Sequence, residues 1–185
     1  MRAVLVIINI IRNNKVKKYV EVGVEHGVTL TKVLSEIDSE LDEYWAIDPW
    51  KPVGLKYGSK LGYRTPLEWY EMYASVCKKM VEFRSLKVVK LPSTYIASLL
   101  PDEHFDMVYI DGDHCYQGVY DDLCAWYPKI KMGGVISGHD WNIRSVRDAL
   151  REFFGIPIDR VKDNEKIWMT IKGEIIPPMY KVIEE

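Results

Sequence analysis

The chain has 185 residues, enough for one domain with a sizeable core. Apolar residues make up 48% and charged residues 28%, which is the balance of an ordinary globular protein. The formal net charge of −2 leaves little drive for binding polyanions, so we expect no nucleic-acid partner.

The N-terminal apolar run AVLVII is too short to span a bilayer, and no small-residue cleavage site follows it. We therefore expect a cytoplasmic protein without a membrane partner. Segment 3–11 is either a helix that covers the core or the surface of a homodimer. The cysteines Cys77, Cys115 and Cys124 are odd in number and lack CxxC spacing, which argues against a disulfide framework and a structural zinc site.

Strands and helices alternate along the rest of the chain. Short apolar runs predict strands at 18–23, 44–48, 86–91, 105–111 and 133–138. Helical spacing predicts helices at 29–37, 66–83 and 94–100, and two more around 119–130 and 146–153. Thr29 is a candidate N-cap of the first helix, and Pro66 opens the second. The segments 159–163 and 166–173 have no helix between them and predict a closing antiparallel pair.

This alternation indicates an α/β fold with a mostly parallel, doubly wound sheet and helices on both faces. Such sheets bind ligands beyond the carboxyl ends of their strands. The carboxyl ends of the predicted strands carry acids, other polar residues and glycine. They are Glu21 and Gly23, then Asp48, then Pro92 and Ser93, then the run Asp111 to His114, and then the pair His139 and Asp140.

The turn EVGVEHG, residues 21–27, follows the first predicted strand. Gly23 and Gly27 would let a ligand approach the backbone closely, although a plain strand-to-helix turn would also use them. The dinucleotide fingerprint GxGxxG is absent, because Glu25 stands at its second glycine. A turn lined by Glu21 and Glu25 suits a positively charged ligand better than a pyrophosphate.

Two further positions each have two interpretations. Asp48 could accept hydrogen bonds from the two hydroxyls of a ribose, or it could satisfy a backbone N–H in an Asp-Pro turn. Ser93 could contact a base, or it could cap the short helix at 94–100.

The stretch YIDGDHCYQGVYDD, residues 109–122, gathers acids at the end of a buried strand. Asp113 could be a helix cap, but Asp111 ends the strand itself. Asp111, His139 and Asp140 come from adjacent strand ends and could hold a divalent cation. The alternative is a hydrogen-bonded polar cluster without metal.

Together these residues resemble the class I S-adenosylmethionine-dependent methyltransferases, from about Lys18 to Lys172. The glycine turn at 21–27, Asp48 and Ser93 match the family's contacts to the methionine part, the ribose and the adenine of the cofactor. The most specific part is FDMVYIDGDHCYQGVYDDLCAWYPKIKMGGVISGHDW, residues 105–141. It is similar to a small-molecule O-methyltransferase branch with IDGxHxY followed by GHD.

The resemblance implies a Rossmann-like sheet of seven strands, order 3-2-1-4-5-7-6 with strand 7 antiparallel, in a single methyltransferase domain over 1–185. It implies S-adenosylmethionine as cofactor and a small-molecule acceptor, most simply a hydroxyl compound. We assign Glu21, Gly23, Gly27, Asp48, Ser93, Asp111 and His114 to the cofactor site. Related enzymes bind Mg²⁺ through acids at the places of Asp111 and Asp140. His139 departs from the usual acid or amide there, so Mg²⁺, another divalent cation or no metal all remain open.

A hydroxyl acceptor must lose its proton, and histidine is the side chain that titrates near neutral pH. His114 and His139 are the candidate bases, ahead of His26 and His104. Segment 51–66 is either a lid over the acceptor or a solvated loop. Two other functions were weighed: a nicotinamide-dependent oxidoreductase, which EVGVEHG disfavours, and a cofactor-binding protein without turnover, which the polar cluster disfavours.

Overall fold

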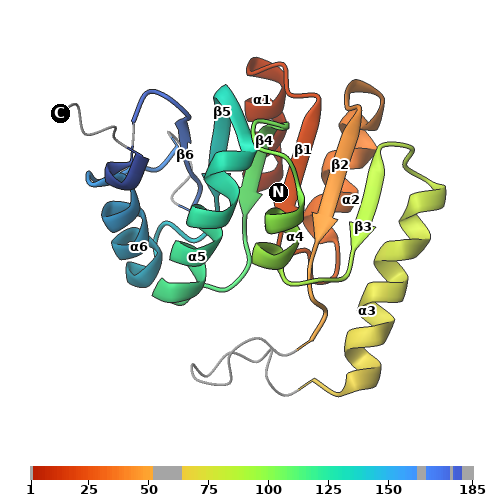
Figure 1. Ribbon diagram of the computed structural model, residues 1–185. Coiled ribbons are helices and arrows are strands. Elements are labelled where there is room, and N and C mark those ends of the chain that lie inside the picture. The colour runs from red at the N-terminus through yellow and green to blue at the C-terminus, as the bar shows by residue number, and fades with distance from the viewer. Residues whose placement is uncertain (1, 52–63, 162–165, 176, 181–185) are drawn as a thin grey trace.

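The computed structural model describes residues 2–51, 64–161, 166–175 and 177–180. Within this part of the chain, helices and strands alternate in the predicted order (Figure 1). The strands are β1 Lys18–Val22, β2 Glu43–Ile47, β3 Leu86–Val89, β4 Phe105–Ile110, β5 Ile130–Gly138 and β6 Trp168–Ile171. The helices are α1 Arg2–Asn13, α2 Val28–Ile37, α3 Pro66–Lys78, α4 Ser93–Leu99, α5 Tyr116–Trp126 and α6 Arg144–Phe154.

The strands form one sheet in the order β3-β2-β1-β4-β5-β6. The first five are parallel, and β6 runs antiparallel to β5, with Gly138 opposite Trp168. β1 lies in the middle, where Glu21 is opposite Ala46 of β2 and Tyr109 of β4. The carboxyl ends of the five parallel strands therefore meet along one edge of the sheet, which is the lower edge in Figure 1.

The sheet differs from the prediction at its far end. The described residues contain six strands, whereas seven were expected. The missing strand, predicted at 159–163, is reduced to an isolated antiparallel bridge between Arg160 and Trp168 and a hydrogen bond from the Val161 N–H to the Ile167 carbonyl. Its last two residues, 162 and 163, lie outside the described residues, as do 52–63 of the segment predicted as a lid or loop.

Each face of the sheet has its own core, because side chains alternate along every strand. Tyr19, Tyr44 and Met107 pack on the face covered by α1, α2 and α3. The alternate residues, such as Val20 and Val108, pack against α4, α5 and α6 on the other face. α1 buries its isoleucines in the first core beside α2, so segment 3–11 covers the sheet.

Local sequence explains where two of the helices begin. Pro66 is the first residue of α3 as predicted, and Thr65 with Glu68 forms a capping box there. The N-cap of α2 is Gly27 in a left-handed conformation with φ 69°, and Thr29 lies inside the helix. The prediction of Thr29 as cap was therefore wrong, because the turn closes two residues earlier. None of the helices in the described residues has the length and apolar character needed to cross a membrane.

Candidate functional site

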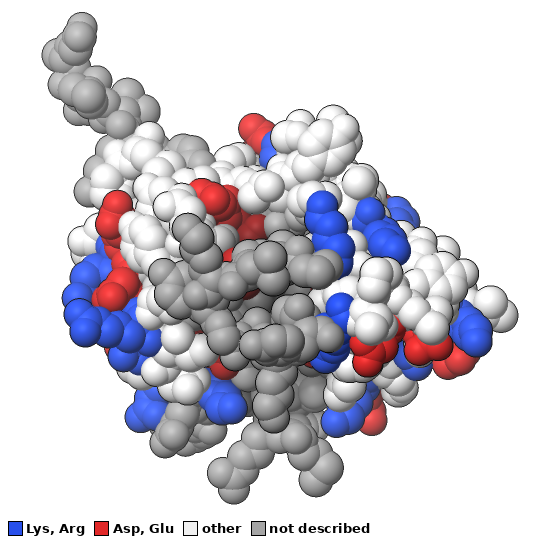
Figure 2. Space-filling view, turned by 90° about the horizontal axis from the view of Figure 1, so that it is seen from below, with Lys and Arg blue, Asp and Glu red and all other residues white. Residues whose placement is uncertain are grey.

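A cleft of about 380 Å³ lies at the carboxyl ends of the parallel strands. The turns after β1, β2, β3 and β4 and the first turns of α5 line it. Figure 2 looks onto this side of the molecule and shows acidic side chains near its centre, with both acidic and basic ones toward its edges. Of the residues predicted to bind the cofactor, the cleft is lined by Glu21, Gly23, Asp48, Ser93, Asp111 and His114. Gly27 is outside this lining and instead ends the turn into α2.

Gly23 brings the first turn into contact with the end of β4. Its φ is +86°, and a Cβ at this position would lie 2.2 Å from the carbonyl oxygen of Asp111. No other residue type fits this conformation and this space without moving backbone. The turn after β1 and the turn after β4 therefore form one continuous surface of the cleft.

Glu21 lies at the bottom of the cleft and is 1% exposed. Burial raises the pKa of its carboxyl to about 8, more than the hydrogen bond from the Tyr44 hydroxyl lowers it, and the charges of Asp111 and Asp48 add to the rise. We therefore expect Glu21 to be protonated at neutral pH in the absence of a ligand.

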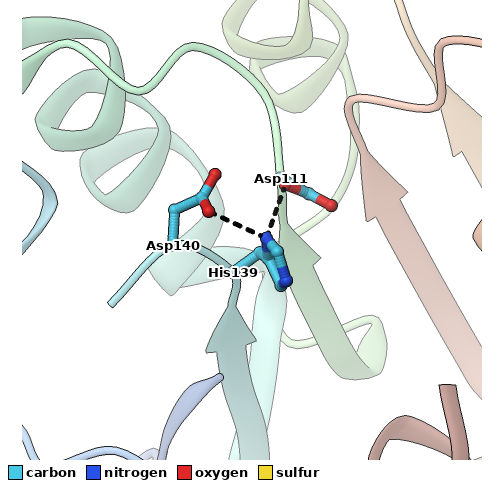
Figure 3. Close-up of side chains that lie close together, drawn as sticks. All are labelled: Asp111, His139 and Asp140. Carbon is cyan, nitrogen blue, oxygen red and sulfur yellow. Dashed lines mark ion pairs between the residues drawn. The ribbon is translucent and has the colours of Figure 1, made fainter. Parts of the chain in front are cut away.

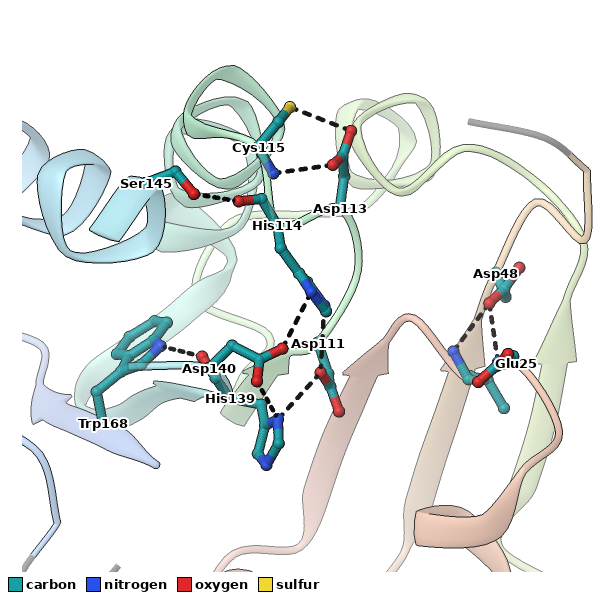
Figure 4. Close-up of polar contacts among 11 residues, drawn as sticks. Glu25, Asp48, Asp111, Asp113, His114, Cys115, His139, Asp140, Ser145 and Trp168 are labelled. Atoms are coloured by element: carbon teal, nitrogen blue, oxygen red, sulfur yellow. Dashed lines mark hydrogen bonds and ion pairs between the residues drawn. The ribbon is translucent and has the colours of Figure 1, made fainter. Parts of the chain in front are cut away.

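Asp48 directly follows β2 and holds the neighbouring backbone in place. One carboxylate oxygen accepts the N–H groups of Val24 and Glu25 at 3.0 and 2.9 Å (Figure 4). The other accepts the N–H of Trp50 at 2.7 Å. The local-turn interpretation of Asp48 is thus seen directly. The side chain also lines the cleft, and a carboxylate has about four acceptor positions, so one remains for a ligand hydroxyl.

Ser93 is the first residue of α4, whose N-cap is Pro92, so Ser93 is not the cap that one interpretation expected. Its hydroxyl donates instead to the carboxylate of Asp122 on α5. Asp122 is 5% exposed and lines the cleft, and burial raises the pKa of its carboxyl to about 7. We did not predict a role for Asp122. The available signal was its helical spacing from Val119 and Trp126, which places an acid on the buried face of α5.

Asp111, His114, His139 and Asp140 form a polar cluster beyond the ends of β4 and β5 (Figures 3 and 4). His139 Nδ1 lies 3.7 Å from Asp111 Oδ1 and 3.1 Å from Asp140 Oδ1. His114 Nε2 is 3.8 Å from Asp111 Oδ1, and His114 Nδ1 is 3.0 Å from Asp140 Oδ2. Ligand atoms of Asp111, His139 and Asp140 all lie within 4.8 Å of one another, a spacing that suits a shared metal ion.

The backbone around this cluster is fixed by several contacts. The His139 N–H donates to the carbonyl of Ile110, and its own carbonyl accepts from the Trp168 indole at 3.1 Å. The hydroxyl of Ser145 donates to the His114 carbonyl at 2.6 Å. Asp140 has a positive φ of 55°, which is uncommon for a residue other than glycine and often marks a functional site.

The cluster shifts the pKa values of its members in opposite directions. The interaction with Asp111 raises the pKa of His114, and the interaction with Asp140 raises the pKa of His139. Burial raises the pKa of Asp111. Burial acts the same way on Asp140, but the neighbouring His139 and His114 outweigh it and lower the pKa of this carboxyl. The imidazoles and carboxylates thus favour each other's charged forms, but at Asp111 burial and the charge of Asp140 outweigh this effect.

The other two histidines lie apart from this cluster. His26 lines the cleft in the turn after β1, near Arg64. His104 precedes β4 and pairs with Glu43 at 3.7 Å, at the opposite ends of the strands. The structure therefore brings together the two histidines that the sequence favoured as bases.

The charge of the cleft restricts its ligand. Its lining contains one lysine, Lys51, against the seven acids Glu21, Glu25, Asp48, Asp111, Asp113, Asp121 and Asp122, of which the raised pKa values leave Glu21 neutral and Asp122 partly neutral. Such a surface repels a pyrophosphate and attracts a cation, which disfavours a nicotinamide dinucleotide. The sulfonium and amino groups of S-adenosylmethionine fit this acidic lining.

Comparison with known proteins agrees with this chemistry. A search of curated proteins found no match. Among solved structures, the fold is similar to a protein from Staphylococcus aureus provisionally described as a caffeoyl-CoA O-methyltransferase, with 16% identity, a TM-score of 0.65, and coverage of 94% of this chain and 84% of that one. It is also similar to the O-methyltransferase NovP, with 17% identity, a TM-score of 0.67, and coverage of 92% of this chain and 78% of that one. A third similar structure is CalS11, a TDP-rhamnose 3'-O-methyltransferase of calicheamicin biosynthesis, with 17% identity, a TM-score of 0.62, and coverage of 94% of this chain and 80% of that one.

At these identities the likeness to solved structures establishes the fold alone. The family comparison goes further, because a family model described as a methyltransferase domain matches residues 20–141, more than half of the chain. With the acidic cleft at the strand ends, this match sets aside both the oxidoreductase and the binding protein without turnover. The chain belongs to this methyltransferase-domain family and is an S-adenosylmethionine-dependent methyltransferase.

Proposed function

We propose that the protein transfers the methyl group of S-adenosylmethionine to a hydroxyl group of a small molecule, with a divalent cation held by Asp111, His139 and Asp140. The observation that carries this proposal is the convergence of two carboxylates and two imidazoles beside the cofactor cleft. The names of NovP and CalS11, both O-methyltransferases, support a hydroxyl acceptor.

When bound, the cofactor supplies an electrophilic methyl group on a positively charged sulfur. The protein must then orient the acceptor and remove its proton. His114 is the better placed base, since it lines the cleft, and its side chain is 43% exposed compared with 21% for His139. Asp140 Oδ2, 3.0 Å from His114 Nδ1, orients the ring and favours the imidazolium that forms when the hydroxyl proton arrives on the other nitrogen.

The donor set of the cluster fits a divalent cation. The carboxylates of Asp111 and Asp140 alone suffice as ligands for Mg²⁺, which keeps several waters. If the His139 imidazole is a third ligand, the site suits Mn²⁺, Fe²⁺ or Zn²⁺ better. Such a cation would lower the pKa of a bound hydroxyl and fix its position. If no cation binds, the histidines alone must remove the proton, so the two versions of the site can be separated by experiment.

The test measures formation of S-adenosylhomocysteine with a panel of catechols, sugars, nucleotide sugars, amines and carboxylates, before and after treatment with a chelator. We expect the chelator to abolish turnover, Mg²⁺ or Mn²⁺ to restore it, and Asp111→Asn to prevent restoration. His114→Ala should lower kcat by on the order of 100- to 10,000-fold. His104→Ala, a histidine outside the cluster, is the matched control and should retain activity. Full turnover in chelator would refute the cation, and turnover on amines or carboxylates alone would refute the hydroxyl acceptor.

A further inference from the structure

A second cavity, of about 540 Å³, adjoins the acidic cleft on the side of β2 and β3. It lies between the turn after β2, the first turns of α3 and the turn after β3 (Figure 1). The two cavities share the lining residues Pro49, Lys51, Trp69 and Pro92, so they are continuous with each other. The proposed methyl transfer gives no role to the charged residues of this second cavity.

The charge of the second cavity is opposite to that of the cleft. Its described lining contains three cations, Lys51, Arg64 and Lys90, and no acid. The Arg64 Nη2 pairs with Glu25 Oε1 at 2.5 Å. Among the described residues, no carboxylate lies within ion-pair distance of Lys51 or Lys90, and Lys90 Nζ instead lies 4.7 Å from the centre of the Tyr73 ring. The two lysines therefore remain available to attract an anion.

Two N–H donors in the wall of this cavity have no acceptor within the part of the chain that the structure describes. They are Nε1 of Trp69, a residue that is 6% exposed, and Nη1 of Arg64, whose guanidinium lies 5.2 Å from the centre of the Trp69 ring. A buried donor without an acceptor costs on the order of 1–3 kcal/mol. Both atoms are enclosed, so a ligand oxygen reaches them after a shift of the Arg64 side chain. Binding would therefore change the surroundings of Trp69.

An oxyanion meets both of these demands. Its negative charge suits the two lysines, and its oxygens are acceptors for the indole and the guanidinium, whose planar fork matches a carboxylate or a phosphate. The cofactor does not supply this group. The carboxylate of S-adenosylmethionine belongs to its methionine part, which the resemblance assigns to the glycine turn at 21–27. The anion must therefore come from a second molecule.

We propose that the cavity between α3 and the turns after β2 and β3 binds an oxyanion, a carboxylate or phosphate group, of a molecule other than the cofactor, held by Lys51, Arg64 and Lys90. The group belongs either to the methyl acceptor, whose remainder extends into the cleft through the shared lining, or to a separate ligand beside it. Only the first source rests on the proposed function, because the cavity and its charges do not depend on the reaction.

The first test titrates inorganic phosphate and benzoate into the cofactor-free protein at constant ionic strength. NMR follows the indole N–H signals of the six tryptophans, and Trp69→Phe identifies the signal of Trp69. We expect this signal to shift in a saturable way with at least one of the two anions. The signal of Trp126, which lies in the core on the other face of the sheet, should stay in place.

Charge variants then locate the anion. Lys90→Gln should weaken its binding by about 5-fold, as for loss of an exposed charge, and Arg64→Gln by on the order of 10-fold or more. Lys87→Gln is the matched control, since Lys87 lies 5.0 Å from the Trp45 ring much as Lys90 lies over Tyr73, but outside the cavity, and its affinity should be unchanged. Should Arg64→Gln fail to fold, the exposed Lys90 decides alone.

A second test identifies the source of the anion. Methyl transfer is measured with acceptor pairs that differ by one anionic group, catechol with protocatechuate and glucose with glucose phosphate. If the acceptor carries the anion, Lys90→Gln should raise KM for the anionic member at unchanged kcat, and Lys87→Gln should not. If a separate ligand carries it, KM should stay the same for both members while the Trp69 signal still responds to the free anion.

The outcomes separate this site from the proposed function. Absence of methyl transfer to every hydroxyl compound would refute the proposed function, and the titration would still decide the anion site. No saturable shift of the Trp69 signal with either anion would overturn the inference. Equal affinity in Lys90→Gln and Lys87→Gln would also overturn it, because the anion would then bind elsewhere.

Discussion

Replacing Glu21 with glutamine tests whether a neutral carboxyl lies at the bottom of the cleft. Burial raises the pKa of this carboxyl from 4.5 to about 8 in the folded protein, and unfolding returns it to its ordinary value. Between these pH values the folded state holds a proton that the unfolded state has released. The free energy of unfolding therefore falls as the pH rises through this window, by about 1.4 kcal/mol per pH unit for one such group.

The size of the pKa shift sets the size of the effect. A rise from 4.5 to about 8 corresponds to at most about 5 kcal/mol across the window. Glutamine keeps an acceptor for the Tyr44 hydroxyl but does not titrate. We expect the free energy of unfolding of Glu21→Gln to depend less on pH, by roughly 3 to 5 kcal/mol between pH 5 and pH 9. The variant should be less stable at pH 5, by about 1 to 3 kcal/mol, because its extra amide N–H has no acceptor.

Urea denaturation of the cofactor-free protein at constant ionic strength measures this difference. The wild-type profile also contains the raised pKa values of His114, His139 and Asp122, each of which makes stability fall as pH rises. These groups are present in both proteins, so they cancel in the difference between the two profiles. Parallel profiles for the wild type and Glu21→Gln would refute the assignment of a protonated Glu21.

Two further substitutions test the backbone of the site by the same denaturation assay. Gly23→Ala should cost about 3 kcal/mol or more, because its Cβ would overlap the Asp111 backbone in addition to the strain of a positive φ. Gly133→Ala is the control, since Gly133 has φ +76° with no atom within 4 Å of its Cβ position, and a cost equal to that of Gly23→Ala would exclude the overlap. Asp48→Ala should lower stability by about 2 kcal/mol or more and also weaken S-adenosylhomocysteine binding, since it frees three backbone N–H groups. Unchanged stability would contradict the structural role of Asp48, and unchanged affinity would contradict its contact with the ribose.

Much of the fold could be predicted because its strands are short apolar runs and its helices have clear periodicity. The polar residues after β1, β2, β4 and β5 then meet at one edge, which is why the proximity of Asp111, His139 and Asp140 could be predicted from the sequence. The strand predicted at 159–163 was a harder case. Among the described residues of this segment, Arg160 forms a bridge with Trp168 and the Val161 N–H donates to the Ile167 carbonyl, which is less than the ladder of a strand.

The errors at the site concern side chains whose partners lie far away in sequence. Ser93 looked like a helix cap because it precedes a short helical pattern, but its hydroxyl bonds to Asp122, 29 residues later. The same distance in sequence left Asp122 without a predicted partner or role. Local spacing predicts which residues share a helix face, whereas only the packing of α4 on α5 determines which of them meet.

The alternation of side chains between the two faces of β1 also favours one register of this central strand against β2 and β4. Tyr19 and Glu21 face one core, and Val20 and Val22 face the other. A shift of β1 by one residue against β2 and β4 would exchange these sets and place the carboxyl of Glu21 among aliphatic side chains with no hydroxyl from Tyr44 to meet it. A misregistered strand would therefore carry an unpaired buried acid. The residue that shapes the bottom of the cleft thus also distinguishes the correct alignment from its nearest competitors while the chain folds.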